Sequence, residues 1–236
     1  MALTLTDGSG AGTDGRPDRN GDGTSDSTHS PDSTYYSASA RQSNGVYRVL
    51  VTLLGALGFL SRFPVGRDDH TWAAFRDTPA AFPVAGYAVG ALVALPVVLA
   101  LAGLGLAALA GSDPTLPTLV RVAGLVVAAE VGAKLGMAAV VCFGTAAHDG
   151  LGSALTERSG PRAFVFPALL SLPAFALTWP QPAAAVALVA GVAAALAVLR
   201  WARAVLGGAS GDVLGATNEI VRVTALHAGV IAWTLS

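Results

Sequence analysis

Residues 80–112 contain no charged side chain. The stretch is longer than the roughly 20 apolar residues that cross a bilayer as a helix, so it predicts a transmembrane span. Pro96 lies inside it and is expected to bend the helix without ending it, because neighbouring helices can satisfy the carbonyl group that it frees. The composition agrees, since only 12% of the residues are charged, roughly half the fraction typical of soluble domains.

Four more apolar segments predict further spans, at residues 118–143, 163–179, 183–199 and 213–233. A shorter apolar segment, residues 49–60, cannot cross a bilayer and is expected to lie in the interface or to re-enter the membrane. The sequence thus predicts an all-α fold. It is a polytopic transmembrane helical bundle of about five full spans with a short interfacial or re-entrant N-terminal helix.

Residues 1–45 are rich in Asp, Ser, Gly and Thr and have few apolar side chains. Such a segment buries too little surface to offset the entropy of ordering the chain. We therefore predict two regions, a disordered acidic tail at residues 1–45 and an integral membrane helical domain at residues 46–236.

Arginines cluster in three of the segments that flank the predicted spans. With five crossings, these three segments fall on one side of the membrane, and the positive-inside rule places that side in the cytoplasm. The arginines are Arg62, Arg67, Arg76, Arg158, Arg162, Arg200 and Arg203. We expect a multi-pass protein of the plasma membrane. The formal net charge of −1 provides no basic field that would attract nucleic acid.

A Gly-rich turn, residues 206–211, leads into the last apolar segment. A helix that opens in glycines leaves its first N–H groups accessible, which suits a phosphate. The predicted phosphate-binding residues are Gly207, Gly208, Ser210 and Gly211. Asp212 and Glu219 follow, two helical turns apart on one face. Because carboxylates beside a phosphate usually hold a divalent cation, both are predicted metal ligands.

Each of these acids also has a plainer interpretation. Asp212 suits a helix cap, and Glu219 is spaced to form a helical ion pair with Arg222. Arg62 ends an apolar stretch at a membrane edge, where arginines often extend toward the headgroups. For Glu130 and Lys134, four residues apart within a span, a structural ion pair is the favoured interpretation.

Three stretches together resemble the cobalamin synthase family, the adenosylcobinamide-GDP ribazoletransferases. Residues 57–65, LGFLSRFPV, are similar to the family's "FLTRLPVP", and residues 82–90, FPVAGYAVG, to its "FPLVGLLLG". Residues 206–216, LGGASGDVLGA, are similar to its "LGGxTGDxLGA", and Glu219 lies where the family also has an acid.

The resemblance implies a reaction. The family joins α-ribazole or its 5′-phosphate to adenosylcobinamide-GDP at the membrane, releases GMP and needs Mg²⁺. This is the last step of adenosylcobalamin biosynthesis. The residues implied as catalytic are Arg62, Asp212 and Glu219, with Mg²⁺ held by the two acids. The implied partners are these small-molecule substrates and the lipid bilayer.

One family feature has no counterpart in this chain. The family carries an acidic segment of the type "HLDGLADTCDG" after its early spans, whereas residues 111–117 here contain only Asp113. The chain therefore resembles a shortened member of the family, for which a partner or oligomer could supply the missing acids. Two alternatives stay open: an inactive membrane scaffold, or a small transporter whose Glu130 and Lys134 carry an ion.

Overall fold

The computed structural model describes residues 33–61, 64–103 and 116–236, with only the backbone for residues 33–44, 103 and 116. Three expectations fall on residues outside these ranges: the tail up to residue 32, the catalytic role of Arg62 and the acid at Asp113. Residues Arg41–Ser236 form one compact unit.

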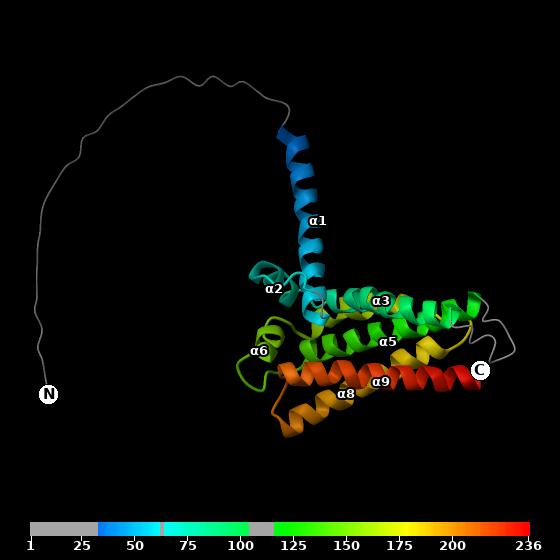
Figure 1. Ribbon diagram of the computed structural model, residues 1–236. Helices are drawn as coiled ribbons and strands as arrows, with labels where there is room; N and C mark the ends of the chain where they lie inside the picture. Colours follow the sequence, from blue (N-terminus) through cyan, green and yellow to red (C-terminus); the bar gives the residue numbers. More distant parts are fainter. Residues whose placement is uncertain (1–32, 62–63, 104–115) are drawn as a thin grey trace, which may run out of the picture. The chain divides into compact units, whose positions relative to one another are not determined.

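The described residues form helices and no strands, which confirms the predicted all-α class (Figure 1). The α-helices are α1 (Ser33–Leu60), α2 (Asp69–Arg76), α3 (Ala81–Gly103), α5 (Leu116–Phe143), α6 (Leu151–Thr156), α7 (Val165–Ser171), α8 (Ala183–Val205) and α9 (Gly211–Leu235). Two short 3₁₀ helices, η1 (Pro161–Phe164) and η2 (Leu172–Ala176), flank α7.

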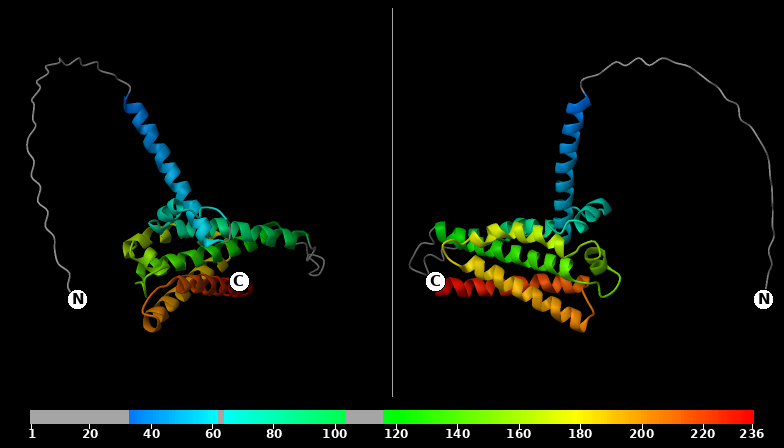
Figure 2. Two further views of the ribbon diagram at one scale, coloured as in Figure 1. Left: turned by 60° about the vertical axis from the view of Figure 1, so that its left-hand side comes forward. Right: turned by 180° about the vertical axis from the view of Figure 1, so that it is seen from behind.

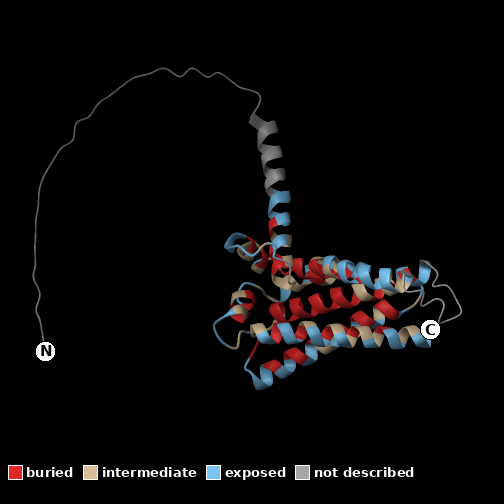
Figure 3. Ribbon diagram, viewed as in Figure 1, coloured by how far each residue is buried: buried red, intermediate tan, exposed pale blue. Residues whose placement is uncertain are grey.

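Helix α5 is the central element of the bundle. It packs against α3, α8 and α9, and α8 also packs along α9 (Figure 2). Every residue from 128 to 142 is buried, and the burial colours of Figure 3 mark α5 as the most enclosed long helix. A polar side chain in this stretch must therefore find its partners within the protein.

Three helices are long and apolar enough to cross a membrane: Ala81–Ala102 in α3, Pro117–Phe143 in α5 and Ala183–Val205 in α8. The predicted span at residues 163–179 is instead the shorter apolar helix Pro161–Ala176, divided among η1, α7 and η2. Pro167 and Pro173 lack the N–H groups of a regular helix there. Helix α9, which contains the predicted span at residues 213–233, has 25 residues but is not one of these three membrane-crossing candidates.

Helix α1 begins earlier than the sequence suggests. The backbone is helical from Ser33, which lies within the segment predicted as a tail. Ala38, Ala40, Arg41 and Gln42 all favour a helix and run directly into the apolar part of α1. That apolar part, Gly45–Leu60, is shorter than a span, as expected for an interfacial or re-entrant helix.

Helices α3 and α5 approach each other closely at two glycines. A Cβ atom at Gly86 would lie 2.8 Å from the Cα of Val131, and one at Gly90 would lie 2.8 Å from the Cα of Val127. Small residues four apart allow the backbones of two membrane helices to come together. These glycines thus determine how closely α3 packs against the central helix.

Helix α2 begins at a side-chain cap. The carboxylate of Asp68 accepts hydrogen bonds from the N–H groups of Thr71 at 3.0 Å and His70 at 3.1 Å. The bond from the N–H of Thr71 is the main cause that lowers the pKa of Asp68 below its ordinary value. The charged carboxylate of Asp68 thus caps and stabilises the N-terminus of α2.

The connections that carry most of the described arginines lie at one end of the bundle. Figure 1 shows α2, α6 and the turn between α8 and α9 together at this end, and the turn before α8 at the other end. The alternating direction of the long helices brings these connections together, as the distribution of arginines predicts.

Candidate functional site

The Gly-rich turn connects α8 to α9 and is fastened to the loop that follows α5. The N–H of Ala209 donates to the carbonyl of Thr145 at 2.7 Å, and the N–H of Ala147 donates to the carbonyl of Ala209 at 3.0 Å. A Cβ atom at Gly208 would lie 2.2 Å from the carbonyl oxygen of Thr145. Backbone meets backbone at this point, which requires a glycine.

The turn presents fewer free N–H groups than the sequence suggests. The N–H of Gly208 donates to the carbonyl of Ala202 at 3.2 Å, and that of Ala209 is used as described above. Gly207 is exposed, with a φ of 79° and no atom within 4 Å of a Cβ placed there. The middle of the turn is therefore a structural clamp, and its exposed corner is Gly207.

Ser210 is the N-cap of α9. Its hydroxyl oxygen accepts a hydrogen bond from the N–H of Val213 at 3.3 Å, so the capping role considered for Asp212 belongs to Ser210. Within the described part of the chain, no group accepts a hydrogen bond from the N–H of Gly211 or Asp212. These two N–H groups at the start of a long helix are the ones that suit an anion.

Asp212 lies at the second position of α9. It is exposed, and it forms no hydrogen bond or ion pair with any residue that the structure describes. Its carboxylate and the free N–H groups therefore occupy the same exposed helix end. Such a carboxylate can bind a cation together with an anionic ligand.

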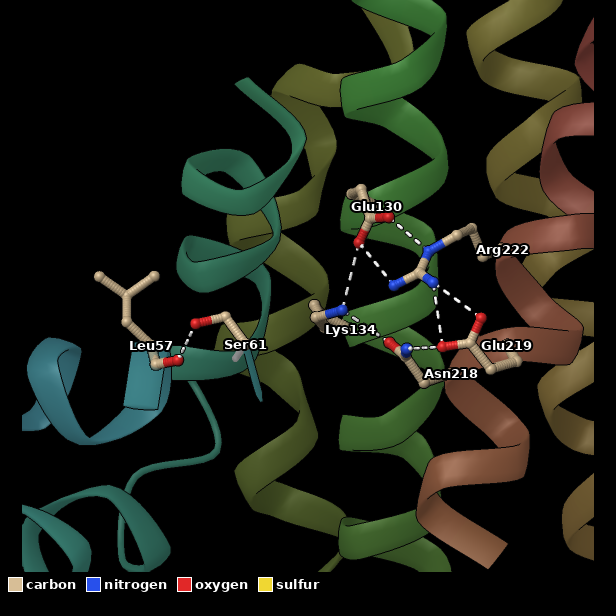
Figure 4. A network of polar contacts seen from close by, with 7 residues as sticks. All are labelled: Leu57, Ser61, Glu130, Lys134, Asn218, Glu219 and Arg222. Atoms are coloured by element: carbon tan, nitrogen blue, oxygen red, sulfur yellow. Dashed lines mark hydrogen bonds and ion pairs between the residues drawn. The ribbon is translucent and has the colours of Figure 1, made fainter. Parts of the chain in front are cut away.

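Glu219 is already engaged with neighbouring side chains (Figure 4). Its two carboxylate oxygens accept hydrogen bonds from Nη1 of Arg222 at 2.9 and 2.7 Å, which confirms the helical ion pair suggested by their spacing. Nδ2 of Asn218 donates to the same carboxylate at 2.9 Å. A metal ion at Glu219 would have to compete with the guanidinium group.

The same network reaches the centre of the bundle through α5. Nζ of Lys134 donates to Oε2 of Glu130 at 3.2 Å and to Oδ1 of Asn218 at 2.6 Å. Arg222 forms an ion pair with Glu130 through Nε and donates to it from Nη2 at 3.3 Å. The side chains of Lys134 and Glu130 are 1% and 4% exposed, which confirms the structural pair predicted for them.

Asn218 is the member of this network that sequence reasoning missed. It lies 84 residues from Lys134, and no spacing within one helix indicates a contact over that separation. The only signal is its position beside Glu219, on a helix where an amide is otherwise unexpected among apolar residues.

A small cleft of about 180 Å³ lies beside the start of α9. Asn218 and Glu219 provide its polar wall, and Gly211 and Gly215 expose backbone to it. The remaining lining residues are apolar: Phe59 and Leu60 of α1, Met137 of α5 and Leu214 of α9. The cleft thus connects the start of α9 at Gly211 with Asn218 and Glu219 of the polar network.

Other polar residues of the site region do not assemble into a metal centre. Nδ1 of His148 lies 2.9 Å from the carbonyl oxygen of Asp149, and both residues are exposed. The described residues include no group of three or more His, Cys, Asp and Glu side chains placed to hold a metal ion. A cation here would depend on Asp212 and on ligands supplied by a substrate.

Comparison with known proteins gives the family. The family model for cobalamin-5-phosphate synthase matches residues 52–112 and 97–230. The chain belongs to this family. Two relatives that this chain covers almost completely are both named adenosylcobinamide-GDP ribazoletransferase. No solved structure matches the chain.

The protein of Halorubrum lacusprofundi is 44% identical, with 79% of this chain and 99% of the relative aligned. That of Haloquadratum walsbyi is 36% identical, with 79% of this chain and 100% of the relative aligned. The Halobacterium salinarum protein of the same name is 49% identical over 150 residues, which are 62% of this chain and 71% of that protein.

The alignment with the Halorubrum protein extends over 258 residues, although it includes only 79% of this chain's own 236 residues. The alignment therefore includes positions at which the relative has residues and this chain has none.

Proposed function

We propose that the chain is an adenosylcobinamide-GDP ribazoletransferase that joins α-ribazole or its 5′-phosphate to adenosylcobinamide-GDP and releases GMP. The observation that carries this proposal is the 44% identity to a relative of that name, of which the chain covers 99%. The site adds a free helix end, Gly211 and Asp212, in the motif where the resemblance places the chemistry.

The proposed step is a phosphoryl transfer. The 5′-oxygen of α-ribazole forms a bond to the phosphorus that carries the cobinamide, and the bond from this phosphorus to the GMP oxygen breaks. The hydroxyl proton leaves to a base or to water, and GMP departs with the bonding electron pair. The N–H groups of Gly211 and Asp212 bind the phosphate oxygens, because they point out of the positive end of α9.

Mg²⁺ fits the residues at this helix end. Magnesium in proteins is often held by one or two carboxylates together with substrate phosphates and water, and Asp212 offers one unpaired carboxylate beside the free N–H groups. When bound, the ion neutralises charge on the phosphate oxygens. Glu219 stays a predicted second ligand, which requires its exchange with Arg222. Arg62 stays a predicted source of positive charge.

We further propose that the site faces the cytoplasm from the plasma membrane. The support is the group of arginines at the end of the bundle that carries the Gly-rich turn, since positively charged connections are retained on the cytoplasmic side. The described members of the group are Arg67, Arg76, Arg158, Arg162, Arg200 and Arg203.

The direct test is product formation by the purified full chain in detergent with both substrates and Mg²⁺. We expect Asp212→Asn to lower the rate by about 100-fold, because it removes one of few charged groups that act on the phosphates. Chelation of Mg²⁺ should abolish the reaction. The matched control is Glu157→Gln, at an exposed position beyond α6, which should keep the wild-type rate.

An unchanged rate in Asp212→Asn would remove the start of α9 from the mechanism. No product from the wild-type chain at any Mg²⁺ concentration would favour the inactive scaffold, the alternative supported by the residues that the Halorubrum relative has and this chain lacks. The transporter alternative gains no support, because Glu130 and Lys134 are buried and paired with each other.

A further inference from the structure

The polar network between α5 and α9 is a closed ring with no net formal charge. Glu130 contacts Lys134, Lys134 contacts Asn218, Asn218 contacts Glu219, and Arg222 joins Glu219 back to Glu130. Two acids balance two bases, which is how charged groups persist inside a membrane bundle. Figure 4 shows the ring between the two helices.

The ring fixes the orientation of the Asn218 amide. Oδ1 accepts from Lys134 and Nδ2 donates to Glu219, so a flipped amide would place a donor against the ammonium group and an acceptor against the carboxylate. The buried end of the ring at Lys134 thus determines how the Asn218 amide is oriented.

After these contacts, the two polar residues that line the cleft retain one unused donor position and one unused acceptor position. Nδ2 of Asn218 has a second hydrogen, since only one of its two donates to Glu219. The bonds from Arg222 and Asn218 use three of the roughly four lone-pair positions of the Glu219 carboxylate. A group that both donates and accepts, such as a sugar hydroxyl, matches this pair.

The rest of the cleft suits a sugar ring. Its volume of about 180 Å³ is below the roughly 300 Å³ at which pockets begin to enclose whole drug-sized ligands. It therefore admits one ring and no complete nucleotide. Leu60, Met137 and Leu214 offer apolar surface to the C–H groups of such a ring, and Gly211 joins the cleft to the proposed phosphate site.

We propose that this cleft is the subsite for the ribose of the nucleoside substrate, whose hydroxyl groups bind Asn218 and Glu219. Glu130, Lys134 and Arg222 are positioning residues that hold these two side chains in place. The inference rests on the proposed function and makes it more specific, because it places the ring that bears the attacking 5′-oxygen next to the N–H groups of α9.

The test measures binding of α-ribazole to the purified full chain by calorimetry without Mg²⁺ and without the corrinoid substrate. We expect Glu219→Gln to weaken binding by about tenfold, because a hydrogen bond to a charged group is lost. Glu157→Gln should bind like wild type, and binding of the free base of α-ribazole should not respond to Glu219→Gln.

A second test fills the cleft with one variant and compares it with a control variant outside the cleft. No atom lies within 4 Å of a Cβ at Gly215, so the backbone accepts a side chain there, and Gly215→Leu adds bulk to the cleft that this glycine lines. It should abolish α-ribazole binding with little change in melting temperature. Ala216→Leu, at the exposed neighbouring position, should leave binding unchanged.

The outcomes separate this inference from the proposed function. If the wild-type chain forms product but Glu219→Gln and Gly215→Leu bind α-ribazole like wild type, the subsite is wrong and the enzyme assignment stands. A shift in the Mg²⁺ requirement of Glu219→Gln with unchanged Mg²⁺-free binding would also overturn the subsite, in favour of a metal ligand. If the wild-type chain neither binds α-ribazole nor forms product, both proposals fail.

Discussion

At the scale of single residues, the site depends on contacts that tolerate little change. Gly208 and Gly152 both lie close to the backbone contact between the Gly-rich turn and the loop after α5. A Cβ atom at Gly208 would lie 2.2 Å from the carbonyl oxygen of Thr145, and one at Gly152 would lie 2.4 Å from that of Ala209. These close approaches fasten the Gly-rich turn, and the N–H groups of Gly211 and Asp212 at the start of α9 stay free to donate.

Gly208→Ala tests this clamp. The substitution combines the overlap with Thr145 and a φ of 155°, and we expect it to destabilise the protein by about 2 kcal/mol or more. Thermal unfolding in detergent, followed by tryptophan fluorescence, measures the effect. The control Gly215→Ala has open space and a helical backbone, so it should be neutral or stabilising by up to about 1 kcal/mol. Equal melting temperatures for the two variants would contradict the clamp.

At the scale of elements, α5 organises the molecule because three long helices contact it. Its buried face carries both apolar residues and the Glu130–Lys134 pair, so it provides the core and the inner half of the polar ring. Close packing against α3 therefore supports the ring from one side while α9 completes it from the other.

Gly90→Leu tests the contact between α3 and α5. A Cβ at Gly90 already lies 2.8 Å from the Cα of Val127, so a leucine must push the helices apart, at a cost of about 3 kcal/mol. The melting temperature in detergent should fall markedly. Ala88→Leu is the matched control, since Ala88 is exposed on the same helix. A comparable loss in both variants would show that added bulk anywhere on α3 is harmful.

At the scale of the whole molecule, the alternating long helices place the Gly-rich turn, the loop after α5 and most of the described arginines at one end. Helix α9 then extends for 25 residues, a rise of about 37 Å, which brings Ser236 to the opposite end. This arrangement makes the direction in which the site faces measurable.

Cysteine labelling in cells tests that direction. In a background with the buried Cys142 replaced by Ala, single cysteines are introduced at Asp149, Val205 and Ser236, all of them exposed. We expect a membrane-impermeant maleimide to label Ser236→Cys in intact cells, and Asp149→Cys and Val205→Cys only after permeabilisation. Labelling of all three from outside, or the reverse pattern, would contradict a cytoplasmic site.

The sequence alone determined the helical class, the three helices that are long and apolar enough to cross a membrane, and the position of the Gly-rich turn before the last helix. These features depend on local properties: the length of apolar runs, the absence of charge and the order of glycines and acids. Local composition misled at residues 163–179, where the predicted span is instead the short broken helix Pro161–Ala176.

Only the tertiary structure decided which polar groups are free. The clamp at Gly208, the contact between Lys134 and Asn218 and the cleft beside Gly211 all join residues from different elements. Such contacts depend on how helices are rotated and how closely they pack, which no pattern within one segment specifies. For that reason the same motif yields N–H groups bonded within the turn, free N–H groups at the start of α9, one unpaired carboxylate and one carboxylate held by an arginine.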